Sequence, residues 1–88
     1  MIWPRDRLTR FETARLIGAR SLQIALGAPI LLDPEEIKDL DSIGIAKQEF
    51  KNKIIPITIK RKLPNGEEMV IAVKPAIENW LIDHEGVI

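Results

Sequence analysis

Residues 10–26 constrain the fold of this chain more than any other segment, because they form a run of good helix formers without a proline. Thr9 is followed three residues later by Glu12. This spacing is typical of a capping box, in which each side chain satisfies a backbone N–H that the first helical turn leaves unpaired. Gly27 can take the left-handed conformation that ends many helices, and Pro29 prevents continuation. The sequence therefore predicts a helix over about 10–26.

Apolar residues occupy most of the circumference of this predicted helix. On a helical wheel with about 100° per residue, four small side chains fall within about 60° of one another. This stripe allows another backbone to approach closely, and larger apolar side chains flank it. The stripe consists of Ala14, Gly18, Ser21 and Ala25, and Phe11 and Leu22 lie at one edge of it.

A helix that is apolar nearly all round is usually a buried helix. A chain of 88 residues offers little else to cover it. We therefore expect either self-association or a larger partner that covers the exposed part. The alternative is a small, well-packed core that leaves a few aliphatic side chains exposed.

A second helix is predicted over about 42–52, with Asp41 as its N-cap. Ile43, Ala46 and Phe50 fall on one face of this helix. The acidic stretch before it contains Asp33-Pro34-Glu35-Glu36, which could form a short helical turn because proline is favoured in the first turn and acidic residues suit the positive end.

The pattern then changes to the period of a β-strand, and residues 55–73 predict a β-hairpin. Isoleucine alternates with other residues over 55–59. Pro56 cannot donate a backbone hydrogen bond, so it belongs at a strand start or an edge. The predicted turn is formed by Pro64, Asn65 and Gly66, with glycine at the position of positive φ.

Two terminal segments complete the predicted single domain, which spans residues 1–88. Residues 1–7 form an N-terminal arm that begins an arginine-rich stretch, including Arg5 and Arg7. Residues 74–88 form a tail in which Pro75 could begin a short helix, with Ile77 and Trp80 at helical spacing. The expected fold is a small α+β domain that is dominated by its two main helices.

Composition argues against a catalytic site in this chain. There is no cysteine, which excludes disulfides, thiol nucleophiles and zinc–thiolate sites. The five glycines are scattered singly, so no glycine-rich phosphate loop exists, and no hydroxyl lies in a G-x-S-x-G context. His84, the single histidine, is expected to be a solvated tail residue. We expect no catalytic residue, metal or cofactor here.

No apolar run approaches the roughly 20 residues that a membrane span needs, and the arginine-rich start lacks the apolar region of a signal peptide. We therefore expect a cytoplasmic protein that does not contact membrane.

The arginines of the first quarter raise the alternative of a free-standing nucleic-acid-binding module. However, Arg10, Arg15 and Arg20 point about 140° apart on the wheel, so they form no single face that follows a phosphate backbone. The 13 basic and 13 acidic residues also give no net charge. Bidentate pairing with carboxylates or carbonyls of surrounding protein fits these arginines better. A homodimer that buries the first helix remains a second alternative.

The order of short motifs resembles the omega-type subunit family of RNA polymerases, which is called subunit K in archaea. The first block is LTRFETAR at 8–15, GAR at 18–20, LQIA at 22–25 and GAP at 27–29. The second block is IA at 45–46, EF at 49–50, IPITIKR at 55–61 and LPNG at 63–66. Residues 67–88 and the acidic stretch 33–41 are not accounted for by the family pattern.

This resemblance implies a non-catalytic subunit of DNA-directed RNA polymerase that latches the C-terminal part of the largest subunit and promotes assembly and stability. Catalytic magnesium would belong to the largest subunit, other polymerase subunits would be neighbours, and DNA would be met only through the complex. The interface implied for the largest subunit comprises Arg10, Phe11, Ala14, Arg15, Gly18, Arg20, Ser21, Leu22, Ala25 and Pro29. Structural caps and turns would be Thr9, Glu12, Gly27, Pro56, Pro64, Asn65 and Gly66.

Overall fold

The computed structural model describes residues 4, 6–84 and 86, and within them the first helix, α1, spans Arg10–Ala25. The predicted capping box is present, because Glu12 N donates to Thr9 Oγ1 at 3.0 Å and Thr9 N donates to Glu12 Oε1 at 2.9 Å. Gly27 adopts the left-handed conformation, with φ of 99°. The predicted boundaries are therefore confirmed to within one residue. Arg5 and Ile88 lie outside the described residues.

The second helix, α2, spans Ser42–Lys51, and Asp41 is its N-cap as predicted. The side chain of Asp41 accepts a hydrogen bond from Gly44 N at 2.7 Å. A Cβ at position 44 would lie only 3.1 Å from Asp41 Oδ1, which explains why glycine suits this first turn. Ala46 and Phe50 are fully buried, whereas Ile43 at the start of α2 is 51% exposed. The acidic stretch before α2 forms hydrogen-bonded turns, and one of them, closed by Glu36 N donating to Asp33 O at 2.9 Å, lies where a short helical turn is predicted.

A buried ion pair joins α1 to α2. Arg20 Nε donates to Glu49 Oε1 at 2.6 Å and Arg20 Nη2 donates to Glu49 Oε2 at 3.0 Å. The two side chains are 3% and 0% exposed. Arg20 also donates to the carbonyl of Pro29 at 2.7 Å, and Glu49 accepts from Leu31 N at 3.1 Å. One charged pair therefore fixes two helices and the loop that connects them.

The hairpin is shorter than predicted. β1 (Lys60–Lys62) and β2 (Glu68–Val70) pair antiparallel, with Arg61 opposite Met69. Of the predicted 55–73, residues 55–59 belong to no strand and Val73 already begins the third helix. Two reasons explain this shortening. Pro56 has no N–H for a ladder, and Ile55 is buried in the helical core instead.

The predicted turn of the hairpin is confirmed. Gly66 has φ of 88° and its N–H donates to Leu63 O at 2.9 Å. The side chain of Asn65 accepts from Glu67 N at 3.0 Å. The third helix, α3, spans Val73–Asp83 and confirms the helix predicted for the tail. Pro75 lies in its first turn, where no intrahelical N–H bond is lost.

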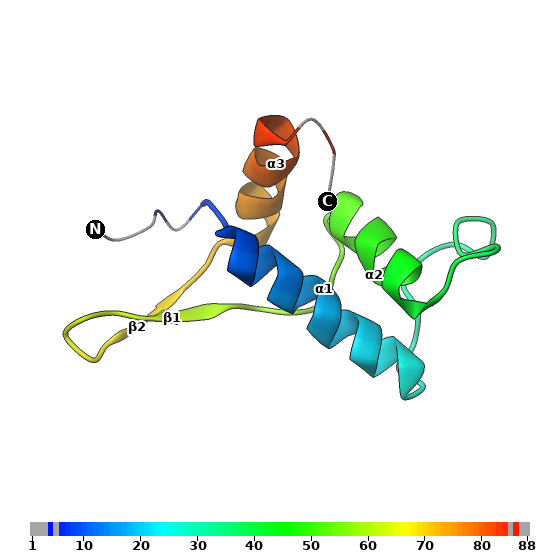
Figure 1. Cartoon of the computed structure of the whole chain (residues 1–88), viewed down its shortest axis with the longest axis horizontal. Helices are drawn as coiled ribbons and strands as arrows, with labels where there is room; N and C mark the ends of the chain where they lie inside the picture. Colours follow the sequence, from blue (N-terminus) through cyan, green and yellow to red (C-terminus); the bar gives the residue numbers. More distant parts are fainter. Residues whose placement is uncertain (1–3, 5, 85, 87–88) are drawn as a thin grey trace.

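α1 runs through the middle of the molecule and α2 packs along it, while α3 contacts α2 and lies near the segment that leads into α1 (Figure 1). The hairpin β1–β2 projects away from the helices. The small α+β body does not cover α1 on all sides, because Phe11 and Leu22 of this helix remain exposed. The core comprises Leu8, Leu16, Ile17, Ala46, Phe50, Ile55, Ile71, Ala76, Ile77 and Trp80.

We predict that Glu49→Gln destabilises the isolated chain by about 3–5 kcal/mol, because it leaves the Arg20 charge buried without its counter-charge. The double variant Arg20→Met/Glu49→Leu removes both charges. Its loss of unfolding free energy should therefore be much smaller than the sum of the losses in the single variants Arg20→Met and Glu49→Leu. Urea denaturation of all the variants measures these free energies of unfolding. A loss below about 1 kcal/mol in Glu49→Gln would contradict the structural role of the pair.

Candidate interaction surface along α1

The polarity of α1 is partly inverted with respect to an ordinary surface helix. Three of its five buried residues, Thr13, Arg20 and Ser21, are polar. On the outside, Phe11 is 74% exposed and Leu22 is 60% exposed. Surface helices normally place apolar side chains inward and polar ones outward. The outer face of α1 is therefore an apolar surface without a partner in the described part of the chain.

A groove of about 640 Å³ runs along this face, and we call it the α1 groove. The small residues predicted from the helical wheel form its floor, α2 forms one wall, and α3 closes it with an indole ring. Its lining residues are Arg10, Thr13, Ala14, Ile17, Gly18, Ser21, Leu22, Ala25, Ile43, Lys47 and Trp80.

Gly18 lies at an open point of the stripe. A Cβ added at this position would meet no atom within 4 Å. The glycine is therefore not required by packing inside the chain, although glycine costs about 1 kcal/mol relative to alanine in a helix interior. Close approach of a partner backbone is a physical reason for it. Ser21 is mostly buried, and its hydroxyl lies 3.2 Å from that of Ser42 on α2.

The structure divides the predicted interface residues among three places. Six of them line the α1 groove, namely Arg10, Ala14, Gly18, Ser21, Leu22 and Ala25. Phe11 and Arg15 line a second hollow of about 430 Å³, between α1 and the extended residues 57–60. Arg20 and the carbonyl of Pro29 are hydrogen-bonded to each other inside the chain. Arg20 makes the expected bidentate contact with a carboxylate and also binds a carbonyl, but both partners, Glu49 and Pro29, belong to this chain and not to surrounding protein.

Five groove residues are outside the predicted interface, namely Thr13, Ile17, Ile43, Lys47 and Trp80. Ile43 and Lys47 are four residues apart on α2, so they lie on one face of that helix. This spacing could have indicated a shared surface. Trp80 comes from α3, which is far from α1 in the sequence, so only the tertiary fold brings it to the groove.

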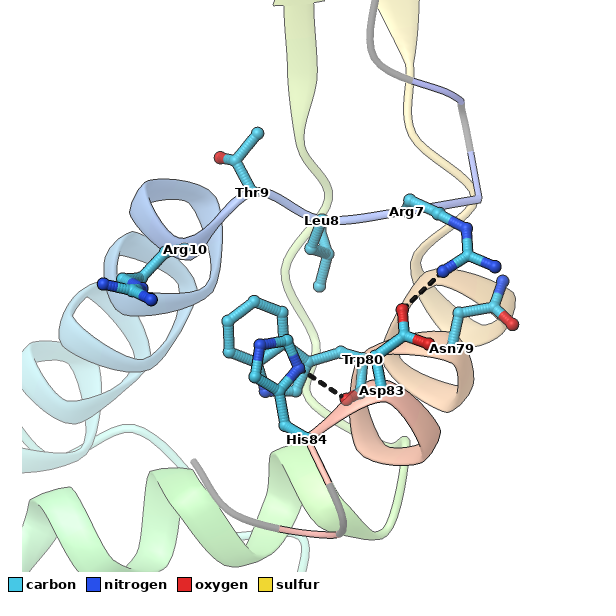
Figure 2. Close-up of a pocket in the computed structure, with 8 residues that line it drawn as sticks. All are labelled: Arg7, Leu8, Thr9, Arg10, Asn79, Trp80, Asp83 and His84. Carbon is cyan, nitrogen blue, oxygen red and sulfur yellow. Dashed lines mark hydrogen bonds and ion pairs between the residues drawn. The ribbon is translucent and has the colours of Figure 1, made fainter.

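A smaller pocket of about 440 Å³ lies between the N-terminal arm and α3 (Figure 2). Arg7 and Asp83 form an ion pair across it, and the indole of Trp80 extends from α3 toward α1. His84 is exposed as predicted, but its ring stacks on Trp80 with 3.7 Å between the ring centroids. His84 therefore helps to close the C-terminal end of α3.

Glu12 and Arg61 fix the N-terminal end of α1 to the hairpin. Arg61 Nε donates to Glu12 Oε2 at 2.6 Å, and Arg61 Nη2 donates to Glu12 Oε1 at 2.7 Å. Arg61 also donates to the carbonyls of Pro4 and Arg7 in the arm. The hydrogen bonds from Arg61 lower the pKa of the Glu12 carboxyl, partial burial opposes the shift, and hydrogen bonds with Thr9 lower the pKa further.

Within the described residues, no group of three or more histidine, cysteine, aspartate or glutamate side chains could hold a metal ion. None of the helices in that part of the chain has the length and apolar character needed to cross a membrane.

Comparison with known proteins gives a consistent result. The family model of RNA polymerase Rpb6 matches residues 6–57. A DNA-directed RNA polymerase subunit Rpo6 from Saccharolobus solfataricus is 47% identical over 73 residues, which cover 83% of this chain and 76% of that protein. The Sulfolobus acidocaldarius subunit Rpo6 is 45% identical over 75 residues, which cover 85% of this chain and 83% of that protein.

A third relative, subunit Rpo6 from Thermoplasma volcanium, is 55% identical over 56 residues, which cover 62% of this chain and 88% of that protein. The chain therefore belongs to the RNA polymerase Rpb6 family. The omega-type resemblance seen in the sequence motifs is confirmed. Because the family match spans residues 6–57, it includes α1 and α2, which carry most of the α1 groove.

We predict that Glu12→Gln lowers the stability of the isolated chain by about 1.5–3 kcal/mol at neutral pH. Because the folded state lowers the pKa of Glu12, this stabilisation is present above the ordinary value of 4.5 and is lost as the pH falls through the lowered pKa. Glu12→Gln should therefore make the loss of stability below pH 4.5 less steep. Urea denaturation at a series of pH values measures both effects.

Glu68→Gln is the matched control for this prediction. Glu68 pairs with Lys60 at 4.0 Å with its side chain 59% exposed, so the substitution should change stability little. Equal effects of the two substitutions would contradict the proposed role of the Glu12–Arg61 pair.

Proposed function

We propose that this chain is a non-catalytic subunit of DNA-directed RNA polymerase that binds the C-terminal part of the largest subunit and stabilises the assembled enzyme. The observation that carries the proposal is the apolar outer face of α1, which this small domain leaves uncovered. Membership in the Rpb6 family, whose archaeal relatives are named as polymerase subunits, supports the choice of partner.

The chemistry of the chain agrees with a purely structural role. Nucleotidyl transfer, with its magnesium ions, would then be carried out by the largest subunit, and other polymerase subunits would be neighbours. DNA would be met only through the complex. A polymerase subunit of this kind acts in the cytoplasm of an archaeal cell.

The ion pairs of the arginines argue against the alternative of a free-standing nucleic-acid-binding module. Arg20 is buried with Glu49, Arg61 is bound to Glu12, and Arg7 is paired with Asp83. Their charges are compensated inside the chain, so they do not form an uncompensated basic face for a polyanion.

We predict that Gly18→Leu weakens binding to the largest subunit at least about fivefold, because a large side chain overfills the floor of the α1 groove. The isolated variant should stay folded, since the structure has open space at this position. Co-expression with the largest subunit, followed by purification at moderate salt, measures the fraction of the chain that is retained.

Lys62→Leu is the control, because it adds the same exposed leucine on the hairpin, away from the groove. Retention should then match that of the original chain. If neither the original chain nor the control co-purifies with the largest subunit, the proposed function is wrong. A dimer of the isolated chain in light scattering would instead favour self-association through α1.

A further inference from the structure

Two buried polar atoms lie without partners beside the α1 groove. Within the described part of the chain, neither Thr13 Oγ1 nor Trp80 Nε1 has a hydrogen-bond partner. Thr13 is 3% exposed and Trp80 is 8% exposed, and both line the groove. Both atoms are themselves buried, so the two side chains must shift for a partner to reach them. An unsatisfied buried donor or acceptor costs about 1–3 kcal/mol, which favours such a shift when a partner binds.

We propose that the α1 groove binds an extended, acidic segment of a neighbouring polymerase subunit, whose backbone supplies the missing partners of Thr13 and Trp80. This inference rests on the proposed function and specifies the chemistry of the partner. An indole N–H can only donate, so Trp80 requires an acceptor such as a carbonyl. The hydroxyl of Thr13 can donate or accept.

The requirement for backbone partners favours an extended segment over a helix. Carbonyl and N–H groups in the middle of a helix are already bonded to one another, whereas an extended chain has both kinds available. The part of α1 that lines the groove, from Arg10 to Ala25, has a length of about 22 Å at about 1.5 Å per residue. An extended segment of about seven residues matches that length.

The charge at the groove favours acidic residues in this segment. Arg10 and Lys47 are exposed on the groove, one on α1 and one on α2. In the described part of the chain neither residue forms an ion pair, and the rest of the lining is uncharged. A carboxylate near these two cations would complement them and would discriminate against basic segments.

Thr13→Val tests the hydrogen bond between the Thr13 hydroxyl and the bound segment, because valine has nearly the same shape and lacks the hydroxyl. The isolated variant should keep or raise its unfolding temperature, since the hydroxyl is unsatisfied there. Its dissociation constant for polymerase assembled without this chain should rise about three- to tenfold. Thr58→Val is the matched control, because Thr58 is exposed and lies outside the groove. Binding can be followed with a dye on Glu67→Cys, since the chain has no other cysteine.

Lys47→Gln tests the charge, with Lys51→Gln as a control on the same helix. Both lysines are exposed, but only Lys47 lines the groove. Lys47→Gln should raise the dissociation constant about two- to fivefold at low salt and reduce its dependence on salt. Lys51→Gln should leave both quantities unchanged.

Crosslinking from Gly18→Cys in the assembled polymerase identifies the segment itself. We expect an apolar peptide with aspartate or glutamate within about seven residues of the crosslink. A basic segment or a helix at this site would overturn the inference. If the chain assembles normally while Thr13→Val and Lys47→Gln behave like their controls, the inference fails and the proposed function stands. If the unmodified chain does not bind the polymerase, the proposed function fails.

Discussion

The buried pair of Arg20 and Glu49 is the interaction on which the rest of the structure depends. It crosses from α1 to α2 and also binds the loop between them through Pro29 and Leu31. Because a buried charge is very costly without its partner, the two helices have little freedom to separate or to slide. The Ile43–Lys47 wall of the α1 groove is held in place by this pair, and so is the inward position of Ser21.

A second charged pair, Glu12 with Arg61, acts at the other end of α1. Glu12 serves two purposes, since it completes the capping box with Thr9 and binds the hairpin. The two pairs therefore use polar chemistry to hold the small domain together. Apolar side chains that a larger protein would place inside are left on the outer face of α1.

Local features of the fold could be predicted from the sequence because their causes are local. The capping box, Gly27 and the turn at Asn65-Gly66 each depend on neighbouring residues, and the structure confirms them. The hairpin is shorter than the sequence predicts. The alternating isoleucines at 55–59 lie in an extended segment that packs against the helices and forms no strand.

The candidate site was predicted only in part. The stripe on α1 follows from helical periodicity, so Ala14, Gly18 and Ala25 were found. The burial of Arg20 could not be predicted, because Glu49 lies 29 residues away and only the packing of α1 on α2 brings them together. Trp80 was missed for the same reason.

The exposed apolar face of α1 has a consequence for the amount of this protein in the cell. A chain with this face uncovered is prone to bind itself or unrelated proteins, and it gains stability only when a partner is present in excess of the dissociation constant. Surplus copies would then be the first to unfold and to be degraded. The steady-state amount of this protein should follow the supply of its partner rather than the rate of its own synthesis.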